Sequence, residues 1–280
     1  MSRKEIYYSD ELNDDFAGTD INTRSIDDSY NYVPSSPLWK SAAFVVYRII
    51  ATPLVWLLCK LVCGLKIKNR AALKKLRGKG FFMYGNHTHG MADAFTPTLA
   101  AFPHRAHIIV NPDAVSIKGL GQIVAMLGAL PIPATLKGMK AFRMAIEERY
   151  SQNRVIAVYP EAHIWPYYTG VRPFPNTSFV YPVKLDAPCV AYAATYRQRR
   201  IFKKLPPLMT ITLSDPIYPD TTLSEHAAKQ KLRDEVYDFL VKTVCTPDNY
   251  EHIKYVYKPK SEMKTESAAT AAVGLNKVSK

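Results

Sequence analysis

The chain has 280 residues, of which 48% are hydrophobic and 11% aromatic, so it can bury a domain core and is not intrinsically disordered as a whole. Its formal net charge is +13, but residues 1–35 carry eight acidic and three basic residues, a net −5, which leaves +18 on the rest. A body this basic favours an anionic partner, either a membrane surface or a phosphorylated or nucleotide-thioester substrate. No run of basic and aromatic residues forms a known nucleic-acid module, so we expect no nucleic-acid partner.

The first segment, residues 1–35, is polar and acidic and shows no apolar period. Segments of this composition bury too little apolar surface to offset the entropy lost on ordering. We therefore predict that residues 1–35 form an acidic flexible tail.

The next segment, residues 36–66, is the most apolar part of the chain. Its longest stretch without charge, residues 49–59, has 11 residues, fewer than the roughly 20 that a membrane-spanning helix needs. Pro53 predicts a kink in this helix. A buried core helix and a spanning helix are both alternatives, but Arg48 and Lys60 can reach lipid head groups from a helix in the membrane interface. We predict an amphipathic, membrane-associated helix over residues 36–66.

Short apolar strands then alternate with helical stretches over residues 67–258, the pattern of an α/β fold with a mixed sheet flanked by helices. The predicted strands are 80–84, 106–110, 129–133, 155–159, 188–195 and 208–213. The predicted helices are 69–76, 95–101, 115–127, 135–150 and 224–244. Residues 259–280 are low in complexity and are predicted to be a flexible C-terminal tail.

The residues most informative about chemistry follow the first of these strands. Gly85, Asn86 and His87 end the strand, and Asp93 follows soon after. Sites in α/β sheets collect at the carboxyl ends of strands. A histidine with a pKa of about 6.5 is a suitable base for a hydroxyl, and a neighbouring carboxylate can fix its tautomer. We predict that His87 and Asp93 are catalytic.

The spacing within this segment leaves a second pairing open. Six positions from His87 to Asp93 correspond to about 600° on an ideal helix, so a loop or bulge must bring the two together. His89 and Asp93 are four positions apart and would share a helix face without distortion. His89 is therefore either the alternative partner of Asp93 or a neighbour that lines the pocket.

Five short blocks in this order resemble the glycerophospholipid acyltransferase family, which includes the lysophosphatidate acyltransferases. The blocks are Asn86-His87 with Asp93, Gly128–Pro133, Tyr159-Pro160-Glu161, Ala187–Ala191 and Ser214–Ile217. The resemblance implies an acyltransferase domain over residues 67–258 that transfers a fatty acyl group to a hydroxyl of a lysophosphatidate-like glycerolipid in phospholipid biosynthesis. It implies no bound cofactor, because acyl-CoA or acyl-ACP (acyl carrier protein) enters as a co-substrate.

The third block departs from the family pattern, in which Gly-Thr-Arg follows the glutamate. Here Ala162-His163-Ile164 follows Glu161, and Ile164 cannot replace an arginine that would contact an acceptor phosphate. Arg172, His163 or the helical set Lys137, Lys140 and Arg143 could take that role. The predicted substrate-binding residues are Asn86, His89, Glu161, His163 and Arg172.

Two other functions fit parts of the same pattern. His87, His89 and Asp93 could belong to a metal-dependent hydrolase, although the favoured interpretation has no metal site. The altered third block would also suit a non-catalytic lipid-binding protein. For the acyltransferase we expect a peripheral or monotopic protein at the cytoplasmic face of the cell membrane, with membrane lipids and an acyl carrier protein or CoA thioester as partners.

Overall fold

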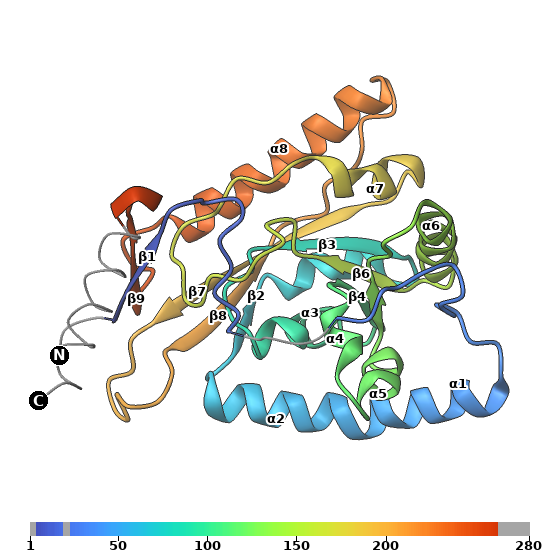
Figure 1. The fold of residues 1–280 in the computed structure, drawn as a ribbon, viewed down its shortest axis with the longest axis horizontal. Helices are drawn as coiled ribbons and strands as arrows, with labels where there is room; N and C mark the ends of the chain where they lie inside the picture. Colours follow the sequence, from blue (N-terminus) through green and yellow to red (C-terminus); the bar gives the residue numbers. More distant parts are fainter. Residues whose placement is uncertain (1–3, 19–22, 263–280) are drawn as a thin grey trace, which may run out of the picture.

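The computed structural model describes residues 4–18 and 23–262 (Figure 1). Its strands are β1 (Lys4–Tyr8), β2 (Lys66–Lys68), β3 (Phe81–Gly85), β4 (Ala106–Val110), β5 (Ala129–Pro131), β6 (Val155–Val158), β7 (Cys189–Arg197), β8 (Leu208–Leu213) and β9 (Ile253–Tyr257). Its α-helices are α1 (Pro37–Phe44), α2 (Thr52–Val62), α3 (Thr96–Ala101), α4 (Asp113–Ser116), α5 (Gly121–Met126), α6 (Leu136–Ser151), α7 (Val180–Lys184) and α8 (Glu225–Val244). A π-helical segment, η1 (Val45–Ala51), joins α1 to α2, and three 3₁₀ helices are η2 (Arg70–Leu76), η3 (Ala92–Ala94) and η4 (Thr177–Phe179). Apart from its first four residues, the predicted tail 259–280 lies outside the described residues.

A seven-stranded sheet, in the order β2-β8-β7-β3-β6-β4-β5, forms the centre of the molecule. The five strands from β7 to β5 in this order pair in parallel, whereas β8 runs antiparallel to β7 and β2 follows β8 in parallel. The prediction of a mixed α/β sheet flanked by helices is confirmed.

The side chains of β3 alternate between the two faces of the sheet, as the period of two in a strand requires. Phe81 and Met83 join a core cluster with buried residues of α2, η2 and α3. Phe82 and Tyr84 join a second cluster, which contains buried residues of α6 and α8. Helices therefore cover both faces, and both faces of β3 are buried. Figure 1 shows the long helix α1–α2 on one side of the molecule and α8 on the other.

All six predicted strands are present, with ends that differ by up to two residues. The helix predicted over 115–127 is wrong, because the chain forms two short helices, α4 and α5, around a turn. Gly119 in that turn has φ of +76°, a conformation that interrupts a helix and that glycine adopts without steric cost. The helix predicted over 69–76 is a 3₁₀ helix, η2.

The predicted membrane-associated helix is a continuous helical segment, Pro37–Val62, of 26 residues. By length and composition it could cross a membrane, and 28% of its most apolar window is buried. Pro53 lies at the start of α2, directly after the π-helical segment, where its missing N–H is accommodated. Large apolar side chains point away from the protein along this helix: Leu38, Phe44, Ile49, Ile50, Leu54, Trp56, Leu57 and Leu61. The alternative of a buried core helix is therefore wrong.

The N-terminal segment also differs from its prediction. β1 pairs in parallel with β9 from Lys4 to Tyr8, and Ile26 and Tyr32 are buried in the second core cluster. The apolar and aromatic residues between the acidic ones supply this packing, which an average over composition does not show. The described part of 1–35 is thus packed against the domain and is not an isolated flexible tail.

Candidate active site

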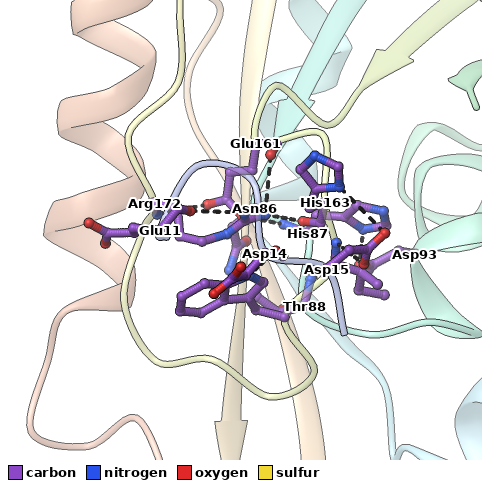
Figure 2. A network of polar contacts seen from close by, with 12 residues as sticks. Glu11, Asp14, Asp15, Asn86, His87, Thr88, Asp93, Glu161, His163 and Arg172 are labelled. Atoms are coloured by element: carbon purple, nitrogen blue, oxygen red, sulfur yellow. Dashed lines mark hydrogen bonds and ion pairs between the residues drawn. The ribbon is translucent and has the colours of Figure 1, made fainter. Parts of the chain in front are cut away.

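The candidate site lies beyond the carboxyl ends of two neighbouring parallel strands. β3 leads into Asn86 and His87, and β6 leads through Tyr159 to Glu161. Because β3 and β6 run in the same direction, their following loops meet at one edge of the sheet. Figure 2 shows the side chains from these loops gathered together.

His87 and Asp93 form a hydrogen-bonded pair. The Nδ1 atom of His87 lies 2.9 Å from Oδ2 of Asp93, and the side chain of His87 is 22% exposed whereas that of Asp93 is 2% exposed. An ionised carboxylate only accepts, so Nδ1 carries the proton and Nε2 has a free lone pair. Among the described residues, Nε2 has no hydrogen-bond partner. The pair therefore leaves a basic nitrogen without a protein partner on a side chain that is partly exposed.

A loop closes this pair, as the spacing in the sequence requires. Residues 86–91 are not helical and form the loop. Asp93 lies in the short helix η3, and its backbone N–H donates to the carbonyl oxygen of His89, which holds Asp93 next to the loop. Oδ2 of Asp93 also accepts from the backbone N–H groups of Thr88 and His89, each at 2.8 Å. The same carboxylate oxygen thus fixes both the imidazole and the loop that carries it.

Tyr159, which the sequence analysis did not single out, holds the other side of the His87 ring. The two rings stack with centroids 4.4 Å apart and an interplanar angle of 20°. The hydroxyl of Tyr159 donates to the backbone oxygen of Asp93 at 2.6 Å. One side chain therefore contacts both members of the pair. The third sequence block contained Tyr159, but only a contact across the β3–β6 pair shows its role.

Glu161 and Arg172 form a buried ion pair behind His87. Oε2 of Glu161 lies 3.5 Å from Nη2 of Arg172, and it accepts from the backbone N–H of His87 at 3.1 Å. Burial raises the pKa of Glu161 and lowers that of Arg172, and the opposite charge of the partner counteracts each shift. Glu161 therefore positions the backbone of His87 and faces the protein interior.

Arg172 departs from its predicted role as a substrate contact. It is 1% exposed, and its guanidinium donates to the backbone oxygens of Glu11, Glu161 and His163. It also lies over the ring of Trp165, 5.1 Å from the centroid. These contacts use the guanidinium within the protein, and the sequence could not show them because Glu11 lies far away along the chain.

Asn86 and His89 are also engaged within the protein, which differs from the prediction that they bind substrate. The Asn86 amide donates to the Ala194 oxygen at 3.1 Å and accepts from the Ala194 N–H at 2.7 Å, so it ties the end of β3 to β7. His89 is 8% exposed, and its Nε2 atom lies 3.6 Å from the sulfur of Cys63. Burial lowers the pKa of His89. His87, and not His89, therefore pairs its imidazole with Asp93.

His163 remains partly accessible, with its side chain 35% exposed, and it lies near His87 (Figure 2). Its Nδ1 atom is 3.4 Å from Oδ2 of Asp15, a residue of the acidic N-terminal segment. That segment is fixed beside the site because the Trp165 indole donates to the Asp14 backbone oxygen at 2.8 Å. Predicting this arrangement from the sequence would require the contact between residues about 150 positions apart.

The donors of the alternative metal site do not converge. His89 contacts Cys63, whereas His87 contacts Asp93. Within residues 4–18 and 23–262, no group of three or more His, Cys, Asp or Glu side chains is placed to hold a metal ion. The spacing of His87, His89 and Asp93 therefore does not translate into a common ligand set.

A likeness to a known protein is found in the structure and not in the sequence. No protein family model matches the sequence, and no curated protein sequence matches it. The structure is similar to the crystal structure of the 1-acyl-sn-glycerophosphate (LPA) acyltransferase PlsC from Thermotoga maritima. The TM-score is 0.48 at 14% sequence identity, and the match covers 74% of this chain and 93% of that one.

Proposed function

We propose that the protein is an acyltransferase that moves a fatty acyl group from a thioester donor to a hydroxyl of a glycerolipid. The observation that carries this proposal is the His87–Asp93 pair, with an Nδ1–Oδ2 distance of 2.9 Å and an unpartnered Nε2 atom at the partly exposed edge of the sheet. A thioester is already activated, so the protein needs a base for the attacking hydroxyl and no nucleophile of its own.

In the proposed reaction, Nε2 of His87 takes the proton as the acceptor hydroxyl oxygen attacks the thioester carbonyl carbon. Asp93 stabilises the imidazolium that forms and keeps its ring in place. The tetrahedral intermediate then collapses, the carbon–sulfur bond breaks, and the imidazolium returns the proton to the leaving thiolate. An ester and a free thiol are the products, and His87 ends in its starting protonation state.

The proposed acceptor is a lysophosphatidate-like lipid, and His163 is the side chain proposed to contact its phosphate. His163 pairs with the Asp15 carboxylate at 3.4 Å, and a phosphate carries the same sign of charge as that carboxylate. An acceptor phosphate would therefore replace Asp15 as the partner of His163. Acyl-CoA and acyl-ACP are the two donors proposed.

The helix Pro37–Val62 supports a place for this reaction at a membrane surface. Its outward apolar side chains include Leu54, Trp56 and Leu61, which are 60%, 56% and 66% exposed. Anionic lipids of the cytoplasmic leaflet would attract the basic body of the protein. We propose that the protein associates with this leaflet, where a lipid acceptor would be available.

The test is a matrix of donors and acceptors assayed with wild type, His87→Ala and a matched control, His226→Ala, whose site is exposed on α8. Acyl-CoA and acyl-ACP are each combined with glycerol-3-phosphate, lysophosphatidate and an unphosphorylated lysolipid. We expect transfer with at least one pair, a loss in His87→Ala of about 10²-fold or more, and normal activity in the control. Hydrolytic activity lost on chelation would favour the metal-dependent hydrolase, and vesicle binding with no turnover would favour the lipid-binding protein.

A further inference from the structure

A second polar site lies at the opposite end of the same strands. A cavity of about 360 Å³ opens beside the amino ends of β4, β5 and β6, and its lining includes residues of α1 and α6. Arg105 directly precedes β4 and Arg154 directly precedes β6. His87 follows the carboxyl end of β3, which runs parallel to its neighbour β6. The cavity and the candidate active site therefore lie at opposite ends of these parallel strands.

The fold itself brings three arginines together at this edge. Ala106 is the register partner of Val155, so Arg105 and Arg154 enter neighbouring strands side by side. Arg149 lies in the last turn of α6, and its backbone oxygen accepts from the Arg154 N–H at 3.1 Å. All three arginines line the cavity.

The positive charge of this cluster is not paired with a carboxylate. Arg105 donates to the Met126 oxygen and lies over the Tyr47 ring, and Arg149 donates to Gln152 and to the Tyr32 oxygen, so the contacts of both within the protein are with neutral groups. None of the three arginines forms an ion pair with another described residue, and the one carboxylate that acts on Arg149 by its charge is Glu148. Burial, together with repulsion from neighbouring arginines, lowers the pKa of Arg105 to about 10. The Nε atoms of Arg105 and Arg149 are buried without hydrogen-bond partners. A partly buried cluster of like charges without a carboxylate is stabilised when an anion binds to it.

His107 adds a buried, neutral imidazole to the same cavity. It is 4% exposed, it lines the cavity, and its Nε2 atom has no hydrogen-bond partner. Burial, and then the charges of the three arginines, lower its pKa well below the ordinary 6.5. The ring is therefore uncharged at neutral pH. A hydrogen bond to the backbone of Gly128 takes its single N–H, so the unpartnered Nε2 atom can accept from a hydroxyl group of the ligand.

We propose that this cavity binds a phosphate group, at a site separate from the His87 site and independent of the proposed acyl transfer. Guanidinium groups match the geometry of phosphate oxygens and bind them through paired hydrogen bonds. Trp39 and the exposed Phe44 of α1 also line the cavity, so apolar surface of the outward-facing helix continues to its rim. The phosphate can belong to an anionic phospholipid head group or to a soluble ion, and the experiment separates these sources.

Isothermal titration of the full chain tests the proposal with two anions, inorganic phosphate and monomeric short-chain phosphatidylglycerol, and with short-chain phosphatidylcholine for comparison. Arg154→Gln removes a guanidinium that makes no hydrogen bond to another described residue, so this variant is expected to fold. Lys40→Gln is a second variant, because Lys40 is exposed on α1 and lines the cavity. Arg143→Gln is the matched control, since it removes the same charge from an exposed position of α6 outside the cavity.

We expect wild type and Arg143→Gln to bind alike, and Arg154→Gln to bind about tenfold more weakly, with a smaller loss for Lys40→Gln. If inorganic phosphate shows this order of affinities, the ligand of the cavity is a soluble phosphate. If phosphatidylglycerol shows it and inorganic phosphate does not, the ligand is a lipid head group. The proposal is overturned if neither anion binds wild type, or if both bind Arg154→Gln as tightly as they bind Arg143→Gln.

Discussion

At the scale of single residues, His87 is held from several directions. Asp93 bonds its Nδ1 atom, Tyr159 stacks on its ring, and Glu161 and Trp165 bond its backbone N–H and carbonyl oxygen. Two of these contacts act on the imidazole ring and two act on the backbone that carries it. Together they restrict the orientations that the ring can adopt. A base held in this way does not have to be reoriented for the proposed reaction.

Asp93→Asn should remove the charge that stabilises the imidazolium while leaving the shape of the side chain. We expect kcat for acyl transfer to fall by roughly 10²- to 10⁴-fold, with a small change in KM, because the proposed role of Asp93 is in the transition state. Steady-state kinetics would show this split. Asp215→Asn is the control, since Asp215 lies on the surface in a pair with Lys75. Equal kcat values for Asp93→Asn and the control would contradict the role of Asp93.

Glu161→Gln should destabilise the fold, because it leaves the buried guanidinium of Arg172 without its opposite charge. Removing one partner of a buried ion pair costs about 3–5 kcal/mol of unfolding free energy. Urea unfolding would measure the loss, with the exposed Glu147→Gln as the control. If the two variants unfold at the same urea concentration, Glu161 does not have the structural role described above.

At the scale of elements, the long helix Pro37–Val62 combines a packed side with an exposed apolar side. Val55 and Cys59 of α2 are buried against the sheet, whereas Leu54 and Leu61 point outward. The helix is therefore attached to the domain along its length and still offers an apolar surface. This geometry suits a helix that lies on a membrane together with its domain.

The double variant Leu54→Asn, Leu61→Asn tests this surface. Loss of two apolar side chains from the lipid interface should weaken binding to phospholipid vesicles by roughly 10-fold or more, given about 0.8 kcal/mol per buried CH₂. Co-sedimentation with vesicles gives the affinity. Leu136→Asn is a matched control, because Leu136 is 91% exposed at the start of α6. Unchanged vesicle binding in the double variant would exclude this helix face as the membrane contact.

Helices and strands that follow from the local order of apolar and polar residues could be predicted from the sequence. The other elements form because they pair with segments that are distant in the chain. The apolar run Val155–Val158 and the alternating Leu208–Leu213 each identify a strand. β1 is a strand because β9 pairs with it, and the local composition around Lys4–Tyr8 gives no such signal.

The same distinction holds for the site. The Gly-Asn-His order and the following Asp93 indicated the pair, and geometry then selected His87 over His89 as its member. Arg172 is predicted to contact substrate because Ile164 replaces the arginine of the family pattern and a guanidinium fits a phosphate. Its burial between Glu161 and Trp165 follows from packing of the N-terminal segment, which no short motif encodes.

At the scale of the whole molecule, charge and burial together determine how stability depends on pH. Burial lowers the pKa of His89, His107 and His252 below the ordinary value of 6.5. On unfolding, these rings regain the ordinary pKa and bind protons more readily. Their contribution to stability is therefore complete above pH 6.5 and is lost as the pH falls from 6.5 toward the lower pKa values of the folded state.

We therefore expect the melting temperature to fall as the pH is lowered from about 7 to about 5, with a loss of about 1.4 kcal/mol per pH unit for each fully shifted histidine. His107→Gln should flatten this dependence, since Gln does not titrate. His226→Gln, at an exposed position of α8, is the control and should keep the slope of wild type. Thermal unfolding followed by circular dichroism across this pH range gives the comparison. Parallel curves for all three proteins would show that buried His107 does not bind a proton on unfolding.

The most direct test of the central claim compares two histidines in the same loop. His87→Gln and His89→Gln are assayed for acyl transfer from a thioester to a lipid hydroxyl, with circular dichroism to confirm that both variants are folded. Because His87 has the free Nε2 atom and His89 is buried against Cys63, we expect His87→Gln to lose about 10²-fold or more in kcat and His89→Gln to stay within about tenfold of wild type. A His87→Gln protein that transfers acyl groups at the wild-type rate would contradict the role of His87 as the base.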